Sequence, residues 1–121
     1  MKKLLAIMMS IIASHSFAGA LDCPSVQAVQ KLRVTNAEQG EFFSGSLWAA
    51  YAKVRIDNDK IWELYIPLTE HPNNEQGAID IGNQTLLRVA AFSGQLEENG
   101  ETICYYAAAD KIVMLKTKHV R

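Results

Sequence analysis

The stretch Thr102-Ile103-Cys104-Tyr105-Tyr106 organises this chain of 121 residues. It follows Asn99-Gly100, and Asn-Gly between two extended segments is the strongest short-range signal for a β-hairpin. We therefore predict a hairpin with strands at 95–98 and 101–108. The sequence holds one other cysteine, Cys23, so a disulfide would join this hairpin to a segment far away in the chain.

The first twenty residues have the order of a secretory signal peptide. Met1-Lys2-Lys3 is basic, residues 4–13 are apolar except for Ser10, and Ala18-Gly19-Ala20 is a small-residue cleavage site. The apolar run is about half of the ~20 residues that a membrane span requires. We therefore predict a signal peptide over 1–20, no membrane span after its cleavage, and a periplasmic or secreted protein.

The two cysteines are expected to form a structural disulfide, Cys23–Cys104. An even number of cysteines in an exported chain favours a disulfide, and Asp22 before Cys23 argues against a lipid-attachment site. The bond would close a loop of about 80 residues, for which the chain-entropy model gives roughly 4 kcal/mol of stabilisation. A redox-active pair would need close spacing such as Cys-x-x-Cys, which the sequence lacks.

Residues 21–121 are long enough for one domain with a modest core. The full chain has a formal charge of −1, and cleavage removes Lys2 and Lys3, so the mature protein is mildly acidic. A small basic group at the C-terminus is typical of a solvated chain end. We therefore expect no nucleic-acid partner.

Hydrophobic periodicity predicts an α+β domain, with about five antiparallel strands and one or two short helices packed on them. An all-β barrel is the alternative. Alternation of apolar and polar residues predicts three further strands, at 47–56, 61–66 and 112–117. The first two each carry a tryptophan that is expected to face the core, and Pro67 is expected to end the second.

Two helices are expected on this sheet. The first is a short amphipathic helix over 25–33, and the second covers 84–92, capped by Asn83 and ended by Gly94. Residues 84–92 could instead be a strand, because Val89 and Phe92 favour β structure. One loop is predicted at 34–46, before the two strands that carry tryptophans, although Phe42-Phe43 within it could form a short strand. A second loop is predicted at 68–77, after those strands, and is followed by a short strand or bend at 78–81.

No catalytic signature is present. The chain lacks a Gly-rich phosphate loop, a nucleophile elbow and a His-Glu-x-x-His sequence. With no clustered thiolates and two histidines in the mature chain, a zinc site is not expected. Glu70, His71 and Glu75 could hold a cation or act as acid and base in a small hydrolase or inhibitor, but ordinary loop composition also accounts for them. We therefore predict a protein that is not an enzyme.

Tyr105 and Tyr106 are the candidate ligand-binding residues. Neighbouring side chains on a strand point to opposite faces, so we expect one ring in the core and one outside. An outer ring near Tyr51 or Tyr65 could form an aromatic platform for a flat ligand or a partner. Packing and sheet formation alone could also explain both tyrosines.

No cofactor is required by the sequence, but haem is the alternative that the tyrosines raise. Tyrosine can ligate haem iron, and His71, His119 and Met114 are second candidates for that role. The leading hypothesis remains an exported, non-enzymatic binding or accessory protein that acts on an unidentified protein or small molecule.

Several features together resemble small exported bacterial proteins of domain-of-unknown-function families: the signal peptide, Cys23-Pro24, strands with Trp48 and Trp62, and the late Cys104-x-Tyr106. Some similar small proteins are associated with hemin binding or with type II secretion. The resemblance implies an exported binding or accessory role and carries no functional residues over to this chain. The scarcity of histidine departs from what a haem protein would need.

Overall fold

The computed structural model describes residues 23–42, 46–56 and 60–118. The predicted signal peptide, Phe43 and His119 lie outside these ranges. Two helices and six strands follow one another along the chain: α2 (Val26–Gln30), β1 (Asn36–Phe42), β2 (Ser46–Ile56), β3 (Lys60–Leu68), α3 (Glu75–Leu87), β4 (Ala91–Glu98), β5 (Glu101–Ala108) and β6 (Lys111–Lys118).

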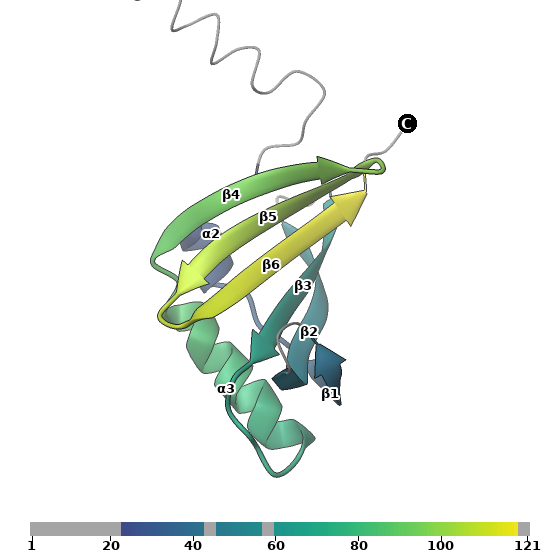
Figure 1. Ribbon diagram of the computed structural model, residues 1–121. Helices are drawn as coiled ribbons and strands as arrows, with labels where there is room; N and C mark the ends of the chain where they lie inside the picture. The colour runs from purple at the N-terminus through teal and green to yellow at the C-terminus, as the bar shows by residue number, and fades with distance from the viewer. Residues whose placement is uncertain (1–22, 43–45, 57–59, 119–121) are drawn as a thin grey trace, which may run out of the picture.

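The strands form one antiparallel sheet in the order β1-β2-β3-β6-β5-β4. Each three-stranded half is a meander, and the halves join where β3 pairs with β6 over Glu63–Tyr65 alone. Figure 1 shows β4, β5 and β6 side by side, with β1, β2 and β3 turning away from them. The predicted α+β class is confirmed, with six strands where about five were expected.

The core lies between the sheet and the two helices. On β3, the side chains of Trp62, Leu64 and Ile66 are buried and alternate with more exposed ones, as the sequence predicted. Leu68, which was expected in a loop, is also buried and ends the strand. On β5 the buried residues are Thr102, Cys104, Tyr106 and Ala108. Within the described ranges, neither helix has the length and apolar character needed to span a membrane.

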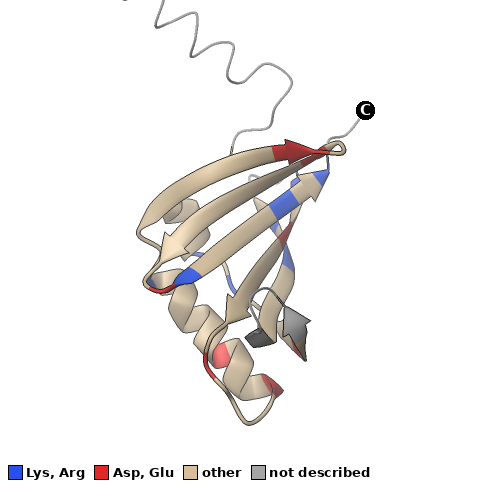
Figure 2. Ribbon diagram, in the orientation of Figure 1, with Lys and Arg blue, Asp and Glu red and all other residues tan. Residues whose placement is uncertain are grey.

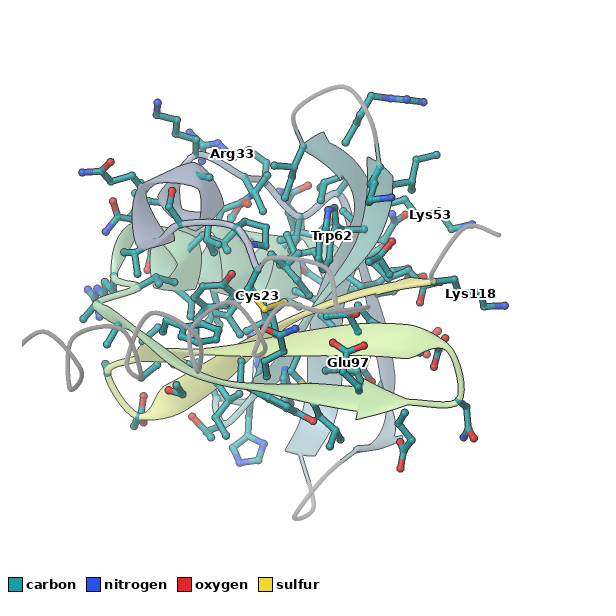
Figure 3. The ribbon with its side chains drawn as sticks, turned by 90° about the horizontal axis from the view of Figure 1, so that it is seen from above. Cys23, Arg33, Lys53, Trp62, Glu97 and Lys118 are labelled. Carbon is teal, nitrogen blue, oxygen red and sulfur yellow. A yellow bond between two sulfur atoms is a disulfide. The ribbon has the colours of Figure 1, made fainter. Side chains whose placement is uncertain are left out.

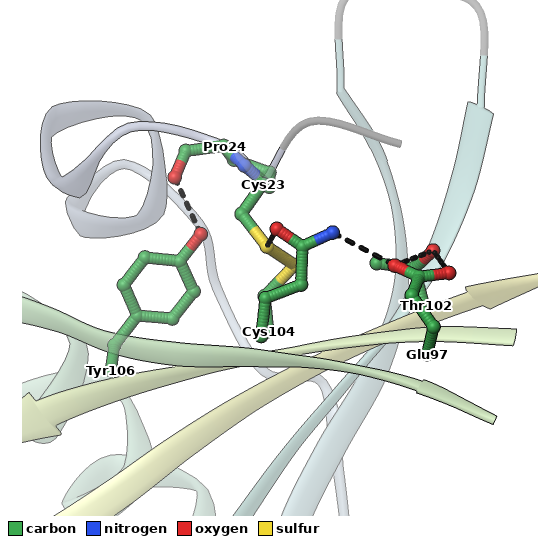
Figure 4. The surroundings of a disulfide bond; sticks show 7 residues. Cys23, Pro24, Glu97, Thr102, Cys104 and Tyr106 are labelled. Carbon is green, nitrogen blue, oxygen red and sulfur yellow. Dashed lines mark hydrogen bonds between the residues drawn. A yellow bond between two sulfur atoms is a disulfide. The ribbon is translucent and has the colours of Figure 1, made fainter. Parts of the chain in front are cut away.

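The predicted disulfide Cys23–Cys104 is confirmed, with an S–S distance of 2.09 Å and a sequence separation of 81. It lies between the segment that enters α2 and the helix-facing side of β5 (Figures 3 and 4). Beside it, the Tyr106 hydroxyl donates a hydrogen bond to the Pro24 carbonyl oxygen. The start of the described chain is therefore held to β5 by one covalent and one polar contact.

The prediction for the second helix was wrong in position. Helix α3 covers Glu75–Leu87, so 78–81 is helix and not strand or bend, and most of the predicted loop 68–77 precedes it. Its N-cap is Asn74, whose side chain accepts from the Gly77 amide at 2.8 Å. Asn83, the expected cap, lies inside the helix, and Gly94 lies inside β4.

Three smaller predictions also need correction. Residues 34–46 are not mostly loop, because β1 pairs with β2. Pro67 does not end β3, because it lies within the strand and stands opposite Ala49 of β2. At this position β3 no longer pairs with β6, so the missing amide hydrogen of the proline costs no hydrogen bond to β6. Helix α2 is shorter than 25–33, and Ser25 is its N-cap.

Candidate functional site

The face of the sheet away from the helices is the candidate site. Because α3 approaches Ala50 of β2, and Cys23 is bonded to Cys104 of β5, both helices lie on the face that carries the core. Alternation along each strand then directs the intervening residues to the other face. On β5 these are Ile103 and Tyr105, and both are partly buried.

One row of directly opposed residues crosses all six strands on this second face. The register gives, from β1 to β4, Asn36, Tyr51, Tyr65, Met114, Tyr105 and Gly94. We call this face of the sheet the tyrosine face. Neighbouring strands lie about 4.8 Å apart, so the span from Tyr51 to Tyr105 is roughly 14 Å.

The tyrosine face is hollowed into a cavity of about 990 Å³. Tyr51, Tyr65, Tyr105 and Met114 line it, and none of these side chains is fully buried. The short β3–β6 junction explains why the sheet can leave this hollow, since the two halves diverge on either side of it. The result is an aromatic surface that the described part of the chain does not cover.

Charged residues flank the aromatic row on both sides. Lys53, Glu63 and Lys116 form the next row, in register across β2, β3 and β6, and the Lys116 Nζ lies 3.8 Å from the Glu63 Oε1. Glu38 of β1 lies on the opposite side of the row. Figure 2 shows basic residues at the beginning and near the end of β6 and acidic ones at the end of β4.

The electrostatic surroundings keep one phenol of the row neutral. Partial burial raises the pKa of Tyr65, and the negative charge of Glu38 raises it further. Both effects disfavour the phenolate, so at neutral pH Tyr65 offers a hydroxyl group and an aromatic ring. Any ligand on this face would therefore meet an uncharged centre between charged margins.

The structure separates the three predicted ligand-binding residues. Tyr105 lines the same cavity as Tyr65 and Tyr51, with Met114 between Tyr105 and Tyr65. Tyr106 is fully buried on the other face, where burial raises the pKa of its phenol and its hydroxyl bonds to Pro24, so it offers no surface to a ligand. His71 is exposed and does not line the cavity.

The loop that carries Glu70 and His71 serves a different purpose. Glu70 Oε2 lies 2.6 Å from the Nζ of Lys111, a side chain that is 8% exposed. Burial pushes the pKa of Glu70 up, but its hydrogen bond with Lys111, backbone hydrogen bonds and the lysine charge lower it overall. This ion pair fastens the loop before α3 to the start of β6. Among the described residues, no group of three or more His, Cys, Asp or Glu side chains is placed to hold a metal ion.

Sequence reasoning missed the cross-strand partners of Tyr105. Tyr51, Tyr65 and Met114 were each considered separately, Gly94 was interpreted as the end of a helix, and neither Asn36 nor the charged margins were connected with the tyrosines. Counting residues outward from the Asn99-Gly100 turn would have paired Gly94 directly with Tyr105, because the register shift in β4 lies further from the turn, between Phe92 and Gly94. Comparison with protein-family models, with curated proteins and with solved structures finds no match.

Proposed function

We propose that this chain is an exported binding protein, without catalytic activity, that holds a ligand on the tyrosine face. One observation carries the proposal: four partly buried side chains, Tyr51, Tyr65, Met114 and Tyr105, stand in one register row inside a cavity of about 990 Å³. Ligand sites are typically concave, largely apolar and lined by aromatic side chains with a few polar groups.

Export is supported by two independent features. The first twenty residues have the sequence pattern of a signal peptide. The Cys23–Cys104 disulfide is compatible with an oxidising compartment, where such bonds persist. A periplasmic or secreted location therefore belongs to the proposal. Fractionation of the producing cells, with mass measurement of the mature N-terminus, tests it.

The ligand-binding proposal is tested with N-phenylnaphthylamine, an uncharged aromatic dye whose fluorescence rises when it leaves water. The purified mature protein should bind the dye saturably. The double variant Tyr65→Ser with Tyr105→Ser should lose at least tenfold in affinity, because it removes the two aromatic rings that flank Met114 in the cavity.

The matched control is Phe92→Ser, which removes a ring that is 47% exposed but belongs to the core-side register, opposite Tyr106. This variant should bind the dye as the unchanged protein does. Thermal unfolding of every variant separates loss of binding from loss of folding. Equal dye affinity in the double variant and in the unchanged protein would refute the proposal.

Haem is a second candidate ligand, favoured by one specific observation. Tyr105 and Met114 face each other across β5 and β6 inside the cavity, so a phenol oxygen and a thioether sulfur are both at hand. Bound haem would supply redox or ligand-binding chemistry at its iron. Hemin titration of Tyr105→Phe and of Tyr106→Phe tests this role. A saturable Soret shift that Tyr105→Phe abolishes and Tyr106→Phe preserves supports haem; an identical response in both variants excludes ligation by Tyr105.

A further inference from the structure

The tyrosine face changes character along its length. Over β6, β5 and β4 the row is flanked by aliphatic side chains: Ile103 and Leu96 stand opposite each other on one side, and Ala107 and Ile112 on the other. Leu96 is 43% exposed and Ile112 is 53% exposed. Apart from Lys116 of β6, which stands opposite Ile103, this half of the face is therefore apolar, and exposed apolar surface commonly marks an interaction site.

The half over β1 and β2 is polar. Tyr51 stands opposite Asn36, with Glu38 on one side of the row and Lys53 on the other. The margins thus carry opposite charges across the same aromatic ring. An ammonium group beside Glu38 would also be attracted to the tyrosine ring faces, and an anionic group would be attracted to Lys53 and Lys116.

Gly94 leaves the apolar end of the row open. It is the residue of β4 that stands opposite Tyr105, and a Cβ atom built on it would meet no heavy atom within 4 Å. Its backbone has no positive φ that would call for glycine. Glycine weakens a strand interior and often marks a site where a ligand approaches the backbone closely.

We propose that the ligand of the tyrosine face is a single-chain amphiphile with a zwitterionic head group. The head lies at Tyr51, between Glu38 and Lys53, and the alkyl chain runs across β3, β6 and β5 and leaves the sheet over Gly94. The inference rests on the proposed function, since it assigns a ligand class to the same site.

Alkylphosphocholines with dodecyl, tetradecyl and hexadecyl chains, the longest of which can reach from Tyr51 to β4, test this inference by titration calorimetry below their micelle-forming concentrations. Affinity for the unchanged protein should rise about two- to fourfold with each added methylene. In Gly94→Leu the rise should stop between the shorter and longer chains, because the leucine would fill the exit over β4. Glu98→Leu, four residues further along the same strand and opposite Glu101 instead of Tyr105, should keep the full rise.

The charged margin has its own variants. Glu38→Gln and Lys53→Gln should weaken all three chain lengths by the same factor, about three- to tenfold, and leave the dependence on chain length unchanged. Affinity that does not depend on chain length, or a Gly94→Leu protein that retains the full dependence, would overturn the inference. In that case, binding of N-phenylnaphthylamine that depends on Tyr65 and Tyr105 would still support the proposed function. If the protein binds neither the dye nor the alkylphosphocholines, both the proposed function and this inference are refuted.

Discussion

At the scale of single residues, the adjacent tyrosines of β5 have opposite surroundings. Tyr106 packs its ring edge-to-face against Phe92, at 5.6 Å between centroids and 65° between planes, and its hydroxyl bonds to the Pro24 carbonyl. Tyr105 lies on the uncovered face. Alternation on a strand predicted that the two rings would part, but nothing local in the sequence indicated which ring would be inside.

Removing single hydroxyl groups should therefore distinguish the two positions. Tyr106→Phe keeps the ring contact and deletes one hydrogen bond to a partly buried carbonyl, so the free energy of unfolding should fall by about 0.5–1.5 kcal/mol. Tyr105→Phe should change it by less than about 0.5 kcal/mol. Urea unfolding of both variants measures the difference, and a larger loss for Tyr105→Phe would contradict the assignment of Tyr106 to the core.

Gly82 sets how closely α3 approaches the sheet. A Cβ atom at this position would stand 2.7 Å from the Ala50 Cβ and 2.8 Å from the Val34 Cγ2, and both neighbours are in the core. Gly82→Ala should therefore lower the stability by about 1–3 kcal/mol through overpacking, although alanine returns up to about 1 kcal/mol of helix propensity. Gly94→Ala, where the same atom meets open space, is the control for urea unfolding and should be nearly neutral. Equal stability of both variants would mean that α3 sits further from β2.

At the scale of elements, α3 shows why part of the fold was beyond sequence reasoning. Its sequence contains two glycines and few apolar residues in its first half, so local propensity does not favour a helix there. Tertiary contacts replace that propensity: the Asn83 Oδ1 accepts from the Val34 amide at 2.8 Å, and its Nδ2 donates to the Val34 carbonyl at 3.3 Å. The side chain read as a cap is thus a bridge to the segment before β1.

The β-strands were easier to predict where both signals, alternation and a turn, occur together. Strand β5 has the predicted bounds, and its turn has positive φ at both Asn99 and Gly100, as a two-residue hairpin requires. Strand β1 has no regular alternation of apolar residues, and its pairing with β2 could not be read from the chain. The residues before Gly94 looked helical locally, but they pair with β5.

The contact between the loop before α3 and β6 should make stability depend on acid pH. The pKa of Glu70 is lowered in the folded protein, so its ion pair with Lys111 stabilises the fold above the ordinary pKa of a glutamate. That stabilisation should be lost as the pH falls below about 4.5 through the lowered value. Glu70 is partly exposed, so we expect at most about 1 kcal/mol at neutral pH.

The measurement compares Glu70→Gln with the unchanged protein in urea unfolding between neutral pH and pH of about 3. The variant should be less stable at neutral pH, and the difference should vanish at the acid end, where the carboxyl is protonated. Glu75→Gln, on an exposed residue at the start of α3, is the control. A difference that stays constant with pH would mean that the ion pair does not carry the effect.

At the scale of the whole molecule, the order of one helix and three strands occurs twice: α2 precedes β1, β2 and β3, and α3 precedes β4, β5 and β6. The sequence shows no corresponding repeat. Pairing of the two last strands, β3 with β6, brings Tyr65 next to Met114 and so completes the aromatic row. The cavity depends on this long-range pairing, which explains why sequence reasoning found its tyrosines and not the site.

The disulfide belongs to this scale too, because it joins the beginning of the described chain to β5, the penultimate strand. The double variant Cys23→Ser with Cys104→Ser should lose about 4 kcal/mol of stability in the chain-entropy model, within an observed range of about 2–5 kcal/mol. Small domains have about 5–15 kcal/mol in total, so the variant should remain folded but unfold at clearly lower urea concentration. A loss below about 1 kcal/mol would mean that other contacts of residues 23–30 keep the chain closed into the same loop without the disulfide. Two such contacts are the hydrogen bond from Tyr106 to Pro24 and the one from the Gln30 Nε2 to the Val89 carbonyl at 2.7 Å.

The same variant tests whether stability and binding reside on separate faces. The disulfide lies on the helix side of the sheet, and the aromatic row lies on the other. Since the sheet register is set by strand pairing and not by the disulfide, the folded variant should bind N-phenylnaphthylamine with unchanged affinity at low temperature, where it is still native. Near-ultraviolet circular dichroism monitors unfolding in the same samples. If dye binding is lost before the protein unfolds, the disulfide that holds the segment before α2 to β5 maintains the curvature of the sheet on which the cavity depends.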